Sequence, residues 1–117
     1  MKEITIYHNP RCSKSRQTLQ LLRDNGVEPK IVEYLKTPPQ KNELKNIADM
    51  LGLRPKEFIR KNENDFKENN FGAVIDNDEK IIDAMTSYPK IIERPIVTAG
   101  KLAVIGRPPE NVLEVLK

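Results

Sequence analysis

The first third of the chain alternates between short apolar runs and one amphipathic segment. Residues 3–7 place Ile4 and Ile6 on one face, which predicts a strand. Asn9-Pro10 ends it, and leucines then predict a helix from about residue 12 to the Asn25-Gly26 stop. Residues 29–35 predict a second strand. The order strand, helix, strand is a βαβ unit, so we expect two parallel strands.

The middle of the chain is predicted to be helical. Thr37-Pro38-Pro39-Gln40 is a helix-start signal, in which Thr37 caps the helix and Gln40 completes a capping box. Apolar residues at 44, 47, 48 and 51 follow with helical spacing, and Gly52 ends that helix. A short helix is expected after Pro55, partial helix over 62–70 and a further helix over 77–87.

The last part of the chain predicts a hairpin and a final helix. Residues 95–98 and 102–105 are two strands around the Ala99-Gly100-Lys101 turn, and Pro108-Pro109 begins the helix. Together these elements predict one α/β domain over residues 1–117, with a four-stranded mixed sheet built as βαβ then ββα. With the helical segment set aside, this is the order of a thioredoxin-like domain.

Composition excludes several classes of function. The 117 residues hold 20 basic and 17 acidic side chains spread along the chain, and only three Phe and three Tyr, also scattered. A nucleic-acid binder concentrates both kinds of residue, so we expect no nucleic-acid partner. No run approaches the roughly 20 apolar residues that cross a membrane, and no signal-peptide h-region is present. We therefore expect a cytoplasmic protein without a membrane partner.

Cys12 is the one cysteine and His8 the one histidine. An internal disulfide and a metal site built on several such residues are thereby excluded, and no metal is expected. Cys12 lies where the first strand meets the first helix, and helix N–H groups, flanking basic residues and His8 favour a thiolate there. The alternatives are a small buried apolar cysteine and a structural histidine in a turn. Ser15 stands where a dithiol enzyme has its second cysteine, so any redox cycle needs an external thiol.

Arg60, Arg94 and Arg107 stand at the ends of predicted elements. Arginine binds tetrahedral oxyanions bidentately, although for each of these residues taken alone the surface-charge interpretation is favoured. Pro95 follows Arg94 at the place where thioredoxin-like folds commonly have a cis-proline facing the active cysteine.

Four motifs in order, at matching spacing, resemble the arsenate reductases that depend on glutathione and glutaredoxin. They are ITIYHNPRCSKSR with the following Thr18-Leu19, YL with TPP, ERPIV and IGRPP, at residues 4–16, 34–39, 93–97 and 105–109. The resemblance implies a thioredoxin-like fold with a helical insertion. It also implies Cys12 as nucleophile and Arg60, Arg94 and Arg107 as oxyanion ligands. The residues expected to support them are His8, Asn9, Ser15, Arg16 and Pro95.

The reaction that this resemblance implies is the reduction of arsenate to arsenite, a step in arsenic detoxification. Glutathione is the expected co-substrate and glutaredoxin the expected partner, with no bound cofactor. The chain stops at Lys117, as in the short, chromosomally encoded branch of that family. Two alternatives stay open. One is a regulator that binds RNA polymerase, although such proteins commonly have Cys-x-x-Cys and Ser15 argues against it. The other is a thiol oxidoreductase with another substrate.

Overall fold

The structure is a computed structural model that describes residues 3–116, and the chain folds as two units. The first unit comprises the chain up to Thr37 and from Arg94 onward, and the second comprises Pro38–Glu93. The single domain expected over residues 1–117 stays a prediction. Within the described residues, no helix combines the length and the apolar content that a membrane span needs.

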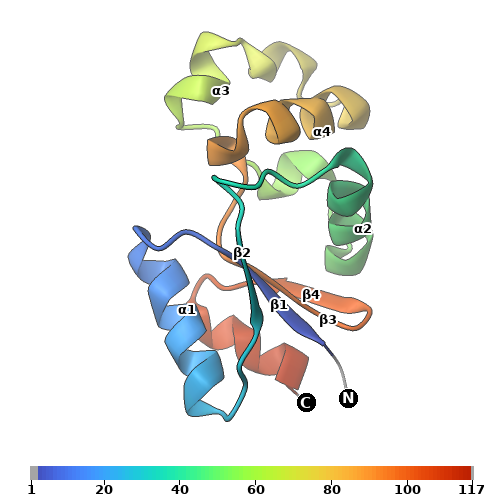
Figure 1. The fold of residues 1–117 in the computed structure, drawn as a ribbon. Helices are drawn as coiled ribbons and strands as arrows, with labels where there is room; N and C mark the ends of the chain where they lie inside the picture. The colour runs from blue at the N-terminus through green and yellow to red at the C-terminus, as the bar shows by residue number, and fades with distance from the viewer. Residues whose placement is uncertain (1–2, 117) are drawn as a thin grey trace. The chain divides into compact units, whose positions relative to one another are not determined.

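A four-stranded sheet forms the centre of the first unit, with the strand order β2-β1-β3-β4 (Figure 1). β1 runs parallel to β2 and antiparallel to β3, and β3 pairs antiparallel with β4. This mixed sheet confirms the predicted α/β class and the βαβ-then-ββα order. The elements of this unit are β1 (Ile4–His8), α1 (Ser13–Asp24), β2 (Lys30–Glu33), β3 (Ile96–Ala99), β4 (Leu102–Ile105) and the 3₁₀ helix η4 (Pro109–Leu116).

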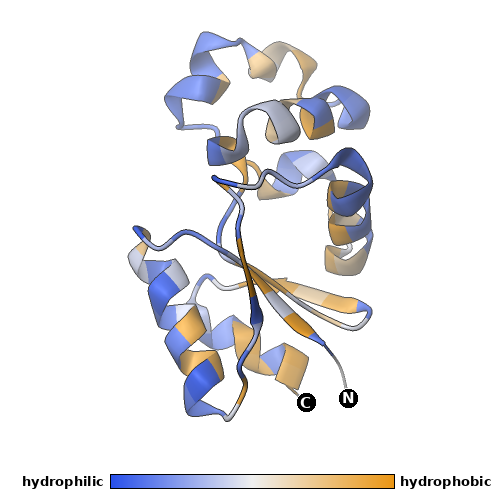
Figure 2. Cartoon of the chain, in the orientation of Figure 1, coloured by the Kyte–Doolittle hydropathy of each residue, from blue (hydrophilic) through white to orange (hydrophobic). Residues whose placement is uncertain are grey.

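The core of this unit lies between the sheet and two helices, α1 and η4, which pack against each other (Figure 1). Alternate residues of the strands point to this side, as the period of two requires. Figure 2 shows β3 and β4 as largely apolar, with apolar stretches in α1 and η4. Each fully buried aliphatic side chain contributes about 1.5–3 kcal/mol. The buried core residues are Ile6, Leu19, Leu22, Val97, Ala99, Val112 and Val115.

The second unit is helical, as predicted for the middle of the chain. Its elements are α2 (Lys41–Leu51), η1 (Pro55–Phe58), α3 (Asn64–Glu68), η2 (Phe71–Val74), α4 (Asp78–Ser87) and η3 (Pro89–Ile91). The residues that α4 buries include Ile81, Ala84 and Met85.

The predicted start of α2 was wrong by several residues. Gln40, and not Thr37, is the N-cap, and its capping box is completed by Glu43. The reason is local, because Pro38 precedes another proline and a residue before proline is pushed out of the helical region. The predicted end is confirmed, since Gly52 takes the left-handed conformation (φ 68°) that favours glycine.

Candidate active site

A tight turn places Cys12 at the start of α1. The Cys12 N–H donates to the Asn9 carbonyl at 3.0 Å, and the Arg11 N–H donates to Asn9 Oδ1 at 3.0 Å. Pro10 occupies the second position of this turn, which its fixed φ suits. Arg16 Nη1 donates to the Pro10 carbonyl at 2.9 Å and holds the turn against the helix. Asn9 and Arg16 therefore support the loop that presents the cysteine.

Cys12 is the N-cap residue of α1, a position usually held by an oxygen-bearing side chain that accepts helix N–H groups. Its side chain is largely buried. Burial raises the pKa of the thiol, but the Ser15 N–H, the Arg94 guanidinium and the Lys14 N–H together outweigh it, so the pKa lies below its ordinary value. A depressed pKa increases the thiolate fraction at neutral pH, and the thiolate is the nucleophilic form.

His8 and Ser15 form a buried pair beside the turn. Ser15 Oγ lies 2.6 Å from His8 Nδ1 and accepts the Asn9 N–H at 3.0 Å. Burial lowers the pKa of His8, although the Glu33 carboxylate opposes this. In the neutral imidazole, the tautomer decides whether Nδ1 accepts the Ser15 hydroxyl proton or donates its own proton to Ser15 Oγ. His8 was expected to favour negative charge at Cys12, whereas its lowered pKa favours the uncharged imidazole.

We expect His8 to titrate below the ordinary histidine value of about 6.5. The unfolded chain then binds the proton more readily than the folded chain, so this group lowers folding stability as pH falls through about 6.5 toward the folded pKa. Because the chain has a single histidine, one imidazole resonance reports the titration by NMR in tag-free protein. A midpoint at or above about 6.5 would contradict the burial argument.

Arg94 and Arg107 come from the other end of the chain and belong to the same unit as Cys12. Arg94 precedes Pro95 through a cis peptide bond, as the position predicted, and its guanidinium interacts with the Cys12 sulfur. Arg107 Nη1 donates to the Arg94 carbonyl at 3.4 Å. Of the three predicted arginines, Arg94 therefore contacts the thiol and Arg107 contacts Arg94.

Arg60 belongs to the second unit, where its Nη1 forms an ion pair with Glu63 Oε1. Its backbone N–H donates to the Ile91 carbonyl at 2.7 Å. The role of Arg60 as an oxyanion ligand stays a prediction. Glu63 was given no role from the sequence, because Arg60 and Glu63 lie between η1 and α3 and no helical spacing rule pairs them.

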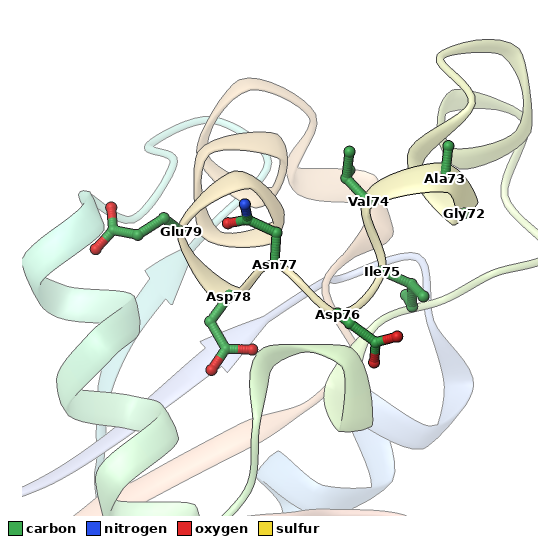
Figure 3. Close-up of a pocket in the computed structure, with 8 residues that line it drawn as sticks. All are labelled: Gly72, Ala73, Val74, Ile75, Asp76, Asn77, Asp78 and Glu79. Carbon is green, nitrogen blue, oxygen red and sulfur yellow. The ribbon is translucent and has the colours of Figure 1, made fainter.

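An open hollow of about 710 Å³ lies in the second unit and is lined by residues 72–79 (Figure 3). Its polar side chains have structural partners. Asp76 pairs with Lys56, Asp78 pairs with Arg54, and Asn77 accepts the Lys80 N–H at the start of α4. These contacts join α4 to η1 and its flanking residue, so we assign the hollow no binding role.

Comparison with known proteins places these features in a family. The sequence profile of the ArsC family matches residues 7–115. The chain is 49% identical over 116 residues to "Uncharacterized protein YfgD" of Escherichia coli (strain K12), covering 98% of each. It is 44% identical over 117 residues to an arsenate reductase of the same organism, covering 99% of this chain and 82% of that protein.

A solved structure agrees with the sequence matches. The arsenate reductase of Vibrio cholerae superposes with a TM-score of 0.93 at 45% identity, over 97% of this chain and 98% of that one. The fold is therefore the thioredoxin-like fold of these proteins, with the helical second unit as the insertion. By its profile, its relatives and its fold, this chain belongs to the ArsC family.

Proposed function

We propose that the protein is an arsenate reductase whose nucleophile is the Cys12 thiolate. The observation that carries the proposal is the setting of this sulfur, which is held at a helix N-terminus where backbone N–H groups and Arg94 all favour negative charge. The similarity to proteins named arsenate reductase supports the choice of arsenate over other oxyanions.

The first step forms a bond between sulfur and arsenic. The Cys12 thiolate attacks pentavalent arsenic and forms an S–As bond. One As–O bond breaks, and that oxygen, which by then carries two protons, leaves as water. A Cys12–arsenate thioester remains. Arg94 and Arg107 neutralise the arsenate oxygens, and charge-assisted bonds of this kind are about twice as strong as neutral ones. Arg60 is the third oxyanion ligand of the proposal.

Reduction needs electrons from outside the chain, because Cys12 is its only thiol. Glutathione displaces a second arsenate oxygen as water and forms a Cys12–As–S–glutathione adduct. A glutaredoxin thiolate then attacks the glutathione sulfur. The bond between arsenic and the glutathione sulfur breaks, and its electron pair stays on arsenic, which becomes trivalent. A glutaredoxin–glutathione disulfide forms at the same time. Water finally hydrolyses the Cys12–As bond to release arsenite and the free thiol. These donors belong to the reducing cytoplasm that we propose as the location.

The donor part of the proposal is tested separately from the reaction. Purified protein is mixed with arsenate, glutathione, glutaredoxin, glutathione reductase and NADPH, and NADPH oxidation is followed. We expect turnover that disappears when either glutathione or glutaredoxin is omitted. Turnover that persists with thioredoxin and its reductase alone would show a different donor, and no turnover with any donor would refute the reaction itself.

We expect Glu63→Gln to lower the arsenate KM by about threefold, because it removes the carboxylate that pairs with Arg60 and competes with an incoming anion. Glutamine keeps the size of the side chain but not its charge. Glu68→Gln, an exposed position at the end of α3, is the matched control and should leave KM unchanged. A KM that is unchanged or higher in Glu63→Gln would contradict the proposed role of Arg60.

A further inference from the structure

Three segments that are far apart in the sequence meet at one closely packed point of the first unit. Thr18 lies on α1, Pro95 directly precedes β3, and Gly106 directly follows β4. The Gly106 N–H donates to the Pro95 carbonyl at 2.9 Å. These segments also bear the proposed chemistry, since Cys12 is the N-cap of α1, while Arg94 and Arg107 adjoin Pro95 and Gly106 in the sequence.

Gly106 has no room for a side chain. A Cβ added there would lie 2.6 Å from Thr18 Oγ1, 2.9 Å from Pro95 Cγ and 3.0 Å from Thr18 Cγ2. Such distances lie well inside van der Waals contact, so any larger residue must push the segments apart. The requirement for glycine here comes from close approach of two segments and not from an unusual φ.

Thr18 fixes the helix side of this junction. Its side chain is completely buried, and its hydroxyl donates to the Lys14 carbonyl at 2.8 Å. The same oxygen lies 3.4 Å from the Gly106 carbonyl. Thr18 therefore contacts the turn of α1 whose N–H groups face Cys12, and also the segment that leads into Arg107.

We propose that Gly106 and Thr18 are positioning residues that set Arg94 and Arg107 against the N-terminus of α1. Their close contact defines how near the arginines lie to the sulfur and to an oxyanion bound beside it. Neither residue touches the reacting atoms. The kinetic part of this inference rests on the proposed function, whereas the part that concerns the thiol does not.

The physical consequence follows from distance. The Arg94 charge contributes to the low pKa of Cys12, and electrostatic attraction weakens as charges separate. Oxyanion binding by arginine depends on geometry even more strongly, because displacement of about 1 Å can cost up to about a hundredfold in rate. A methyl group at position 106 should therefore change both properties.

The test uses Gly106→Ala in the full chain. The rate of alkylation by iodoacetamide against pH gives the pKa of the single thiol, and the coupled assay gives the arsenate KM. We expect the thiol pKa to rise and the KM to increase by about tenfold. Gly72→Ala is the matched control, since an added Cβ there meets only one atom, at the ordinary distance of 3.9 Å, and both values should stay at the wild-type level.

Thr18→Ala gives a second, independent variant. It removes the two Thr18 atoms that a Cβ at position 106 would strike, and it loosens the junction without a clash. Alone, it should raise the arsenate KM by about threefold. Combined with Gly106→Ala, it should bring the thiol pKa and the KM part of the way back to wild type.

A merely structural role predicts a different pattern, with lower thermal stability but a wild-type thiol pKa and KM in every variant that folds. That pattern in Gly106→Ala, or in Thr18→Ala if Gly106→Ala does not fold, would overturn the proposal. A raised thiol pKa in a protein that never turns over arsenate would keep the positioning role and refute the proposed function instead.

Discussion

Cys12→Ser should reduce arsenate turnover by about a thousandfold or more, because a serine hydroxyl stays protonated at neutral pH and is a poor nucleophile. The fold should survive the change. Cys12 occupies the N-cap of α1, and serine is among the preferred residues there since its oxygen accepts helix N–H groups. We therefore expect thermal stability equal to or above wild type alongside the loss of activity.

Chemical modification of the wild-type protein provides the control for this variant. One iodoacetamide-derived group per chain, confirmed by mass, can only be on Cys12 among the thiols, and it should abolish turnover to the same extent. Arsenate present during alkylation should slow the labelling, because arsenate bound beside Cys12 blocks the access of iodoacetamide to the sulfur. Turnover by Cys12→Ser above about a tenth of the wild-type rate would remove the cysteine from the mechanism.

Arg94→Gln is expected to have the second-largest effect. It removes the Arg94 charge, which contributes to the low pKa of Cys12, so the alkylation profile should move to higher pH. It also removes a charge-assisted contact to arsenate, worth about 1.5–3 kcal/mol, so the arsenate KM should rise about ten- to a hundredfold. The two readouts are independent, since alkylation requires no arsenate.

Two further variants serve as controls for Arg94→Gln. Arg94→Lys keeps the charge but loses the forked donor geometry, so the thiol pKa should change little while the arsenate KM still rises. Arg54→Gln removes an arginine whose ion pair with Asp78 is half exposed, and both properties should match wild type. An unchanged alkylation profile in Arg94→Gln would contradict the role given to Arg94.

Local patterns were enough to predict the strands, the βαβ order and the position of Cys12 at a helix start. Each of these depends on residues close together in the sequence, such as the alternation at Ile4 and Ile6 or the Asn9-Pro10 break. The start of α2 was misplaced because two rules compete at Pro38-Pro39, and the restriction before proline outweighs the capping signal at Thr37.

Contacts between distant segments could not be predicted in the same way. Flanking basic residues were expected to lower the pKa of Cys12, but the charge that does so belongs to Arg94, near the other end of the chain. The approach of Thr18 to Gly106 joins residues separated by 88 positions. The sequence indicates which residue types are present, whereas these pairings depend on how the hairpin packs against α1.

The central claim is that this chain converts arsenate to arsenite through Cys12, and direct measurement of arsenite tests it best. Wild-type protein is incubated with arsenate, glutathione and glutaredoxin, and the two arsenic species are separated and quantified against Cys12→Ser. We predict arsenite in amounts far exceeding the protein, formed only by wild type and only with both donors present. Equal arsenite from the two proteins, or none above the protein-free control, would contradict the account.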